Sequence, residues 1–235
     1  MKKYLIITLV IINANIYCQT IFGKVTYSIQ PLEMEVKSEN PKVKMLHQEM
    51  KKRAENQQYF LEFNTTKSRF YKNDVLGVSM HSDEKERLLQ KTSSILYGTN
   101  DTYYYDKESS RIIIKKDDGN LFFLDEKQDW VITSESKKIG DYICYKATCE
   151  KLGMNRNGEK KVTNVIAWFA PILPYSFGPK DFNGLPGLIL ELHFYKSVFL
   201  ATNIEVNTTS NKVIELPKGK MIDYKEYQKS FVGKI

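Results

Sequence analysis

The chain has 235 residues, of which 42% are hydrophobic and 12% aromatic, so it can bury a sizeable core and is not a disordered chain. Its formal net charge is +7, but the lysines are interspersed with acidic residues in runs such as HSDEKERL and KKDDGN. That mixture is typical of a solvated surface, and we expect no nucleic-acid partner.

The first eighteen residues have the organisation of an export signal. Lys2 and Lys3 form a charged start, and the apolar run Tyr4–Ile12 that follows is too short to span a bilayer as a helix. We expect a cleaved signal peptide over 1–18 and one mature domain over 19–235. The mature protein is then periplasmic or secreted and not transmembrane, and the loss of two lysines lowers its formal charge from +7 to +5.

An outer-membrane lipoprotein is the alternative reading of the N-terminus. In that reading Cys18 carries the lipid, but Asn15, Ile16 and Tyr17 match poorly the small residues that such processing requires. We therefore favour simple cleavage near Cys18 or Gln19.

A helical pattern stands between 41 and 56. Apolar residues recur there at spacings of three, four and four, at Val43, Leu46, Met50 and Ala54. Asn40 suits the N-cap and Pro41 the first turn. We expect one amphipathic helix packed on a sheet with its lysine-rich face in solvent, rather than a helix lying on a membrane surface.

From residue 57 onward, short strand-like segments alternate with turn residues about every 8 to 12 residues, as in an antiparallel sheet or barrel. Asp118-Gly119 separates two apolar runs and predicts a hairpin with a two-residue turn, because glycine accepts a positive φ. Asn157-Gly158 marks another reversal.

Cys144 and Cys149 are the cysteines of the predicted mature chain. Five residues along a strand span roughly 16 Å, whereas a disulfide needs Cα atoms closer than about 7 Å. An odd spacing also places the two side chains on opposite faces. We expect free thiols, and neither these residues nor the three histidines predict a metal site.

The segment GPKDFNGLPGLILELHF, residues 178–194, is dense in glycine and proline before an apolar run. It lacks the Lys-Ser or Lys-Thr of a phosphate-binding loop. Pro186 and Gly187 suit a type II turn, which gives Gly187 a positive φ. In the strand that follows, alternation predicts a core face with Leu192 and an amphipathic face with Glu191 and His193.

At these residues the chain resembles the GLPGLI family of secreted Bacteroidetes proteins. The motif is complete, as Gly184, Leu185, Pro186, Gly187, Leu188 and Ile189. The resemblance extends through CYKA at 144–147, the segment 167–182 and FLATNIE at 199–205. One departure is FAPILP, where Ala170 and Leu173 stand near the Ile-Pro step in place of the acidic residue we associate with the family.

The family is also similar to the bowl-like N-terminal domain of some bacterial peptide-N-glycosidases. The resemblance implies a curved or half-closed antiparallel sheet and carries no catalytic residues with it. The expected fold is thus mainly β, with a single antiparallel curved sheet or half-open barrel, the helix near 41–56 and a short C-terminal helix where Tyr224, Tyr227 and Phe231 share spacing.

Four residues are candidates for ligand binding. Glu191 and His193 stand two apart on a strand, within reach of each other, as half a metal site or a proton-transfer pair requires; a solvated strand face has the same pattern. Trp168 and Phe169 suit either an aromatic-lined concavity or the core, as do Tyr103 to Tyr105.

The sequence favours a secreted or periplasmic envelope protein that binds or presents an apolar or peptide-like ligand, or an outer-membrane protein partner, without chemistry of its own. We expect no catalytic residues, no cofactor and no metal. The alternative is an envelope hydrolase, or the accessory domain of an enzyme that processes glycans or peptides. A structural subunit of an outer-membrane complex is a third reading.

Overall fold

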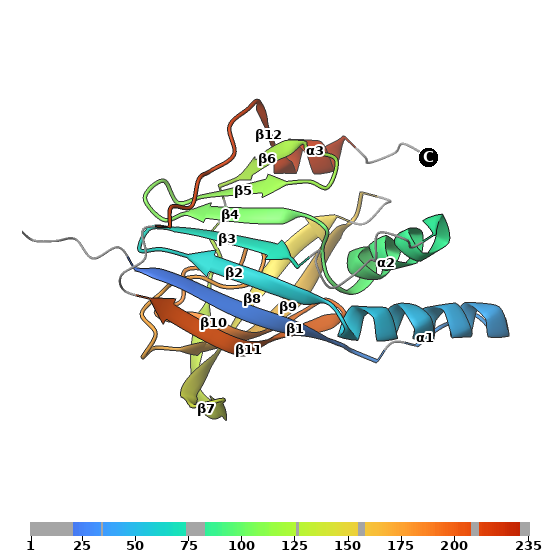
Figure 1. Cartoon of the computed structure of the whole chain (residues 1–235), viewed down its shortest axis with the longest axis horizontal. Helices are drawn as coiled ribbons and strands as arrows, with labels where there is room; N and C mark the ends of the chain where they lie inside the picture. The colour runs from blue at the N-terminus through green and yellow to red at the C-terminus, as the bar shows by residue number, and fades with distance from the viewer. Residues whose placement is uncertain are drawn as a thin grey trace, which may run out of the picture.

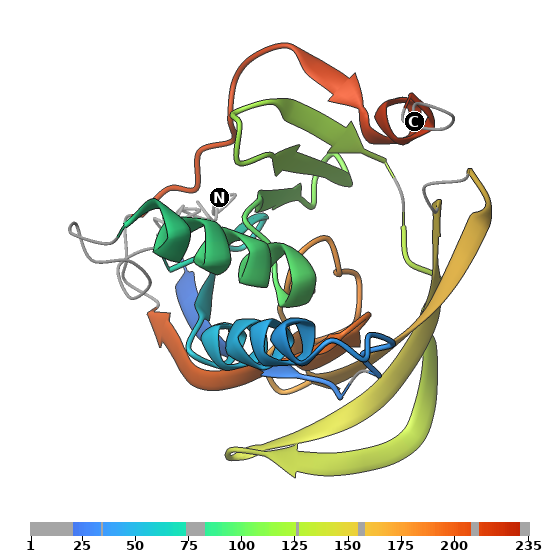
Figure 2. The same cartoon turned by 90° about the vertical axis from the view of Figure 1, so that its right-hand side faces the viewer.

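The computed structural model describes residues 21–33, 35–73, 83–125, 127–154, 158–207 and 212–230. The predicted signal peptide, the cleavage site, Phe231 and Asn157 lie outside the described residues. The described residues form one open, curved sheet with three helices, which confirms the mainly β, bowl-like prediction (Figures 1 and 2).

Twelve strands make up this sheet among the described residues. Their bounds are β1 Phe22–Pro31, β2 Gln58–Phe63, β3 Lys67–Lys72, β4 Thr102–Asp106, β5 Arg111–Lys115, β6 Leu121–Leu124, β7 Val131–Ile139, β8 Tyr142–Met154, β9 Lys160–Ala170, β10 Leu188–Phe194, β11 Ser197–Asn207 and β12 Met221–Asp223. The helices are α1 Pro41–Glu55, α2 Glu84–Tyr97 and α3 Tyr224–Lys229.

The strand order is β12-β6-β5-β4-β3-β2-β1-β11-β10-β9-β8-β7. Neighbours are antiparallel, except that the short β12 runs parallel to β6. Figure 2 shows the strands curving round most of a ring, with the β12 and β7 ends apart. The sheet is therefore a half-open bowl whose concave side can be lined from several strands at once.

An aromatic cluster fills one part of the concave side. Tyr59 stacks on Phe70 with ring centroids 5.4 Å apart, and Phe199 meets both rings edge-on at 5.6 and 5.9 Å. All three side chains are buried. Alternation along β2, β3 and β11 points these side chains inward, and their rings pack together so that this part of the concave side is filled core.

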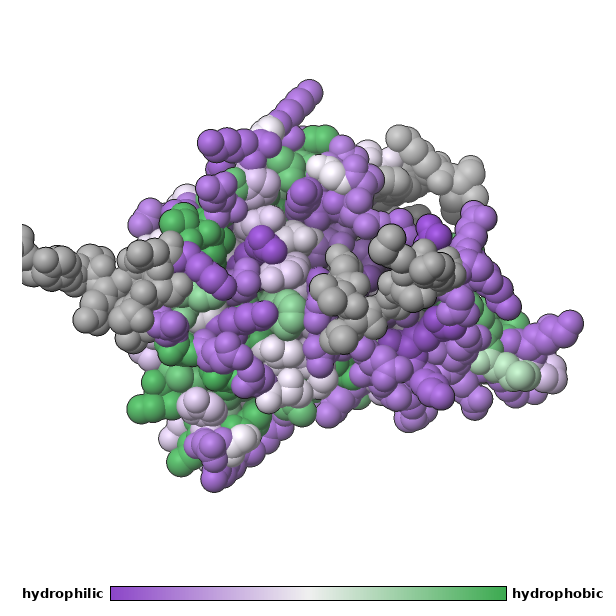
Figure 3. Space-filling model, viewed as in Figure 1, coloured by the Kyte–Doolittle hydropathy of each residue, from purple (hydrophilic) through white to green (hydrophobic). Residues whose placement is uncertain are grey.

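The predicted helix near 41–56 is confirmed as α1, with Asn40 accepting a hydrogen bond from the backbone N–H of Lys42. Its apolar face is covered along only part of its length: Ala54 is buried, whereas Val43 and Leu46 are 42% and 43% exposed. Figure 1 shows why, since the N-terminal half of α1 extends past the end of the sheet. Hydrophilic residues cover most of this helix in Figure 3.

Helix α2 was not predicted, because the charged run at its start was read as a solvated surface segment. Its inward side is mostly polar, with Gln90, Ser93 and Ser94 buried beside Tyr97 in the last turn, so it lacks the apolar period of an amphipathic helix. The signal present in the sequence was the cap: Asp83 accepts a hydrogen bond from the N–H of Glu86, the acid-x-x-acid spacing of a helix start.

The predicted hairpin after β5 is present, but its loop is one residue longer than expected. Lys116 and Asn120 still pair, through the Lys116 N–H and the Asn120 carbonyl at 2.9 Å. Gly119 donates back to the Lys116 carbonyl and has φ 87°. A three-residue loop that ends on a glycine with positive φ reverses the chain between two antiparallel strands, as the two-residue turn would.

The predicted C-terminal helix is confirmed as the short α3. Its Tyr227 ring lies 4.3 Å, and its Tyr224 ring 5.9 Å, from the ring of Phe122 on β6. The shared spacing of the two tyrosines therefore serves to dock the helix on the end of the sheet. None of the described helices is long and apolar enough to cross a membrane.

The loop between β9 and β10 runs inside the bowl (Figure 2). The predicted type II turn is wrong, because Gly187 does not have a positive φ; Gly184 does, at 90°. Gly187 is required for another reason, since a Cβ there would lie 2.4 Å from the carbonyl oxygen of Ala170. The glycine lets the end of the loop pass close to the backbone of β9.

Strand β10 also departs from simple alternation at its start. The register with β9 shifts between Ile189 and Glu191, and all residues from Leu188 to Leu192 are buried. The bulge adds one residue, so the apolar run is covered on both sides. The predicted amphipathic face therefore begins only at Glu191.

Candidate functional site

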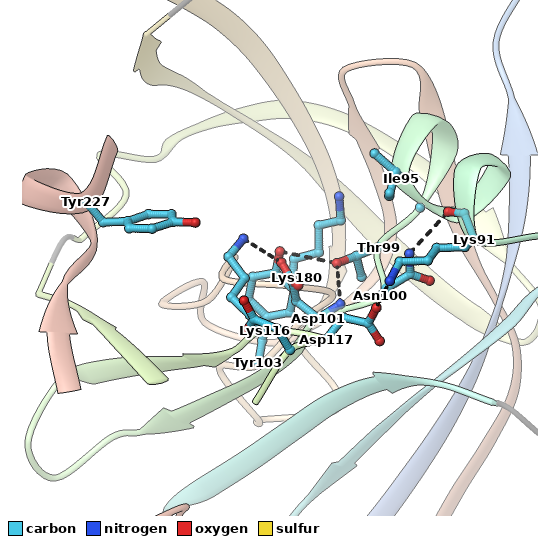
Figure 4. Close-up of a pocket in the computed structure, with 12 residues that line it drawn as sticks. Lys91, Ile95, Thr99, Asn100, Asp101, Tyr103, Lys116, Asp117, Lys180 and Tyr227 are labelled. Carbon is cyan, nitrogen blue, oxygen red and sulfur yellow. Dashed lines mark hydrogen bonds and ion pairs between the residues drawn. The ribbon is translucent and has the colours of Figure 1, made fainter. Parts of the chain in front are cut away.

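The concave side holds a hollow of about 470 Å³ between α2, β4, the β5–β6 turn, α3 and the β9–β10 loop (Figure 4). A smaller hollow of about 210 Å³ lies between β8, β9, α3 and the same loop. Tyr103 and Lys180 line both. We call the two together the bowl hollow. Segments far apart in the chain thus meet around one tyrosine and one lysine.

Lys180 reaches the bowl hollow from a tight turn of the inner loop. The N–H of Phe182 donates to the carbonyl of Pro179 at 3.2 Å, and Lys180 within that turn has φ 58°. Its ammonium lies 5.3 and 5.4 Å from the ring centroids of Phe194 and Phe199. Aromatic faces attract the cation at this distance, although they give it no hydrogen bond.

Burial lowers the pKa of Lys180 from 10.5 to about 8. Asp181 and Asp101 act in the opposite direction, and Lys151 and Lys116 add to the lowering. Removal of the ammonium from water outweighs these charges. At neutral pH the group is still mostly protonated, so the bowl hollow contains a cation that is poorly solvated.

The other lysines that line the bowl hollow are paired with aspartates. The ion pairs are Lys91–Asp117 at 2.5 Å, Lys116–Asp101 at 2.8 Å, and Lys151–Asp181. Figure 4 shows the Lys116–Asp101 pair between α3 and α2. Within each pair the lysine and the aspartate neutralise each other, so Lys180 is the lining lysine without an ion-pair partner among the described residues. The carboxylate of Asp118 also lines the hollow, and it accepts hydrogen bonds from the backbone and side-chain nitrogens of Asn120.

Tyr103 contributes the aromatic surface of the bowl hollow. Burial raises its pKa well above the ordinary value, with Asp101 and Asp181 adding to the effect. Its hydroxyl lies 3.5 Å from Thr99 Oγ1. The neutral phenol is therefore a hydrogen-bonding group and not a base at physiological pH.

The prediction that Tyr103 to Tyr105 could line a concavity is refined by alternation along β4. Tyr105 points inward as Tyr103 does and packs on Phe177, with ring centroids 6.1 Å apart. Tyr104 lines a hollow of about 610 Å³ on the outer face with Arg69. That outer hollow is larger, but it lies on the outer face of the sheet, away from the unpaired cation.

The predicted pair Glu191 and His193 is brought together, with His193 Nε2 2.5 Å from Glu191 Oε1. The structure adds a third member, Lys137 on β7, whose ammonium donates to both carboxylate oxygens at 2.6 and 2.7 Å. That ammonium also lies 4.4 Å from the ring of Trp168. Three of the four predicted residues therefore form one cluster around an unforeseen lysine.

This cluster lies on the side of β10 opposite Leu192 and Phe194, which point to the concave side. Burial alone would raise the pKa of Glu191, but the hydrogen bonds of His193 and Lys137 outweigh it and hold that pKa below its ordinary value. Glu191 is therefore a carboxylate already neutralised by its neighbours, and it is only 8% exposed. The alternative reading of a solvated strand face is therefore wrong for Glu191.

Phe169, the fourth candidate, is 2% exposed and belongs to the core. The hollows described above are lined by other residues. The ligand-binding role of Trp168, Phe169, Glu191 and His193 stays a prediction. Lys180 was missed, because a lysine in a glycine-rich loop looks like a surface residue until the path of the loop is known.

Cys144 and Cys149 are free and buried. Burial raises the pKa of each thiol to about 11. The charges nearest to them differ: Lys137 and Glu191 act on Cys144, and Lys151 and Asp181 act on Cys149. The thiols therefore lie in separate environments. No group of three or more potential metal ligands occurs in the part of the chain that the structure describes.

Residues 153–191 match the model of a family described as a protein of unknown function (Porph_ging), and this segment contains Lys180. No curated protein matches the sequence. The name of the GLPGLI family stays a prediction.

Two crystal structures of PNGF-II, in the C2 and P21 space groups, are similar to this chain, with TM-scores of 0.53 and 0.51 and 15% identity. The similarity covers 91% of this chain and 33% of PNGF-II, so the chain spans about a third of that protein's length. The predicted likeness to a domain of a peptide-N-glycosidase is confirmed at the level of the fold.

Proposed function

We propose that this protein is a non-catalytic binding domain of the bacterial cell envelope, secreted or periplasmic, whose ligand occupies the bowl hollow. The observation that carries the proposal is the convergence of Tyr103 and Lys180 where the two parts of the hollow meet. A concave site with aromatic surface and a few placed polar groups is the usual form of a small-ligand site.

The polarity of the lining discriminates between the two expected ligand classes, apolar and peptide-like. Charged and amide side chains such as Asn100, Asp101 and Lys116 form most of the lining of the larger part of the hollow, beside Tyr103 and Tyr227. An apolar ligand would displace water from these side chains and offer them no hydrogen bonds in exchange. We therefore favour a peptide-like ligand, which carries hydrogen-bonding groups, over a purely apolar one.

The competing hydrolase reading would centre on Glu191 and His193. A general acid or base there would need the carboxylate to meet a substrate, but Glu191 is 8% exposed and both of its oxygens accept from Lys137. That arrangement favours a structural ion-pair network over proton transfer.

An accessory role beside an enzyme is compatible with the binding proposal. The fold that this chain shares with PNGF-II accounts for a third of the PNGF-II chain. In that case the bowl hollow would hold part of a glycan or peptide substrate, or a partner segment at the outer membrane, while chemistry occurs elsewhere.

Photocrosslinking tests the proposal. A benzophenone side chain is introduced at Ile95 or at Tyr227, which line the hollow, and at Tyr195, which is 54% exposed and outside it, as the control. Irradiation of producing cells followed by mass spectrometry of the purified protein should show a discrete adduct at Ile95 and Tyr227 only. Equal adducts at all three positions, or none at the hollow positions, would contradict a ligand in the hollow.

Localisation is tested by N-terminal mass analysis of the exported protein. We expect the chain to begin within a residue or two of Gln19. A diacylated Cys18 would show the lipoprotein alternative instead.

A further inference from the structure

Lys180 occupies a backbone position that lysine rarely adopts. Its φ of 58° lies in the left-handed region, which glycine and asparagine adopt more readily than other residues. A glycine would satisfy the turn between Pro179 and Phe182 without this strain. Strain of this kind persists where the surrounding structure holds the residue in place, and it gathers at functional sites.

The ammonium of Lys180 also lacks a counter-ion. Among the described residues its contacts are the faces of two phenylalanine rings, with no hydrogen bond or ion pair. The three other lysines of the hollow each have an aspartate. Strained backbone and an unpaired, poorly solvated cation are two separate observations at one residue, and both are unfavourable in the ligand-free protein.

We infer that Lys180 is the anion-recognising residue of the bowl hollow and pairs with a carboxylate of the ligand. This inference rests on the proposed binding function and adds the chemical class of the ligand. A carboxylate supplies the missing acceptor, and binding then recovers what the empty site lacks.

A single negative charge suits the site better than a doubly charged phosphate. One ammonium is unpaired, and the carboxylates of Asp101 and Asp181 lie near enough to influence Lys180. A second negative charge on the ligand would face these groups. Tyr103 and Tyr227 line the same hollow and offer ring surface to the remainder of the ligand. The terminal carboxylate of a peptide and the carboxylate of an acidic sugar both satisfy this chemistry.

The test uses the purified protein with its lysines reductively methylated with ¹³C, so that each dimethylammonium gives an NMR signal. The signal of Lys180 is the one lost in Lys180→Gln. N-acetylglycine and glucuronate are the carboxylate probes, and N-acetylglycinamide and glucose are their neutral counterparts at equal ionic strength.

We expect one of the carboxylates to shift the Lys180 signal saturably and to raise the pKa of that group above its value in the same protein without the probe. The pKa rises because a bound anion favours the charged form. The neutral counterparts should bind the parent protein at least about tenfold more weakly than the carboxylate does. The carboxylate should likewise bind Lys180→Met at least about tenfold more weakly than it binds the parent, since a hydrogen bond to a charged group accounts for such a factor. A response to N-acetylglycine alone indicates a peptide terminus, and a response to glucuronate alone indicates an acidic sugar.

Three results with these probes would overturn the inference. The first is that no carboxylate moves the Lys180 signal. The second is that carboxylate and neutral probes bind alike, and the third is that the carboxylate binds Lys180→Met as well as it binds the parent. The crosslinking experiment decides the proposed function independently, so an adduct at Ile95 and Tyr227 together with a silent Lys180 would retain the binding site and reject the anion.

The control variant is Lys91→Met. It also removes a cation that lines the hollow, but one that pairs with Asp117, and neither of these two residues is among the charges that act on Lys180. Binding of the carboxylate probe should fall much less in Lys91→Met than in Lys180→Met. An equal fall in both would mean that the overall charge of the hollow, and not Lys180, attracts the anion, and this too would overturn the inference.

Discussion

A side chain on Gly187 would collide with the carbonyl oxygen of Ala170, because a Cβ built on this glycine lies 2.4 Å from that oxygen and 2.7 Å from the carbonyl carbon. Both atoms belong to the backbone and cannot rotate away. The end of the inner loop lies against the end of β9 here. Glycine is therefore required at position 187 because there is no room for a Cβ, and not because of its φ angle.

We therefore expect Gly187→Ala to lower the free energy of unfolding by about 1 to 3 kcal/mol, the usual range for overpacking. Gly184→Ala should lower it by about 1 kcal/mol, because it meets no atom within 4 Å but has φ 90°. Gly153→Ala, whose Cβ would lie 3.8 Å from its nearest neighbour, is the control and should change little. Denaturant melts of the three variants measure these differences, and a Gly187→Ala protein as stable as Gly153→Ala would contradict the contact.

The cluster of Lys137, Glu191 and His193, on the side of β10 that faces away from the bowl hollow, should affect stability in acid. Glu191→Gln should lower the free energy of unfolding at neutral pH by about 1 to 3 kcal/mol, because Lys137 loses its charged partner at a buried site. The folded-state pKa of Glu191 is below its ordinary value. Its stabilising effect is thus present above the unfolded-state pKa and is lost as the pH falls through the folded-state pKa.

Thermal melts of the parent and Glu191→Gln should accordingly converge as the pH is lowered below the ordinary carboxyl range. His193→Gln is the matched variant and should have a smaller effect at neutral pH, since its side chain is 33% exposed. Parallel curves at all pH values would show that the carboxylate does not stabilise the fold through its charge.

Lys180 should act on stability in the alkaline range. Its pKa is about 8 in the folded protein and 10.5 ordinarily, so the unfolded chain binds more protons between these values and stability rises with pH there. The destabilisation caused by the half-buried ammonium is complete below about pH 8 and relieved above 10.5. We expect Lys180→Met to be more stable than the parent at neutral pH, with the difference shrinking through this window.

Lys160→Met, at an exposed strand position, is the control and should show no such window. Chemical-denaturation curves at several alkaline pH values provide the measurement. A Lys180→Met protein that is less stable than the parent at neutral pH would mean that the cation has a stabilising partner in the free protein.

The two thiols should be inert in the folded protein. Cys144 and Cys149 are buried, and burial raises the pKa of each to about 11, so the reactive thiolate is scarce at neutral pH. Iodoacetamide should label neither residue in native protein and both in denatured, unreduced protein. Protection of the pair after denaturation would reveal a disulfide, and rapid native labelling would reveal an opening of β8.

The sequence predicted the elements whose pattern is local. Helix α1 was found because apolar residues and a cap agree, and the hairpin at Gly119 because its positive φ leaves a clear signature. Helix α2 was missed because its buried side is mostly Gln90 and serines. Ser93 is held there by Met50 of α1 and by Gln57 just before β2, contacts that the local sequence does not show.

The candidate site divides in the same way. Glu191 and His193 were expected to meet because spacing along one strand is a local property. Their third partner, Lys137, comes from β7, and Lys180 enters the hollow only because the loop after β9 turns inward. Neither contact leaves a periodic pattern or a motif in the sequence, because both depend on which distant segments become neighbours in the fold.

The pairing of β1 with β11 at the middle of the sheet has a consequence for how the chain folds. Val25 on β1 lies opposite Leu61 on one edge and Ile204 on the other, so β1 takes its second neighbour from a strand near the other end of the described residues. Contacts between such distant segments form slowly, since a long loop must close before they stabilise anything. The two halves of the bowl are therefore joined late, and β1 has an unpaired edge in the middle of the sheet until β11 is in place.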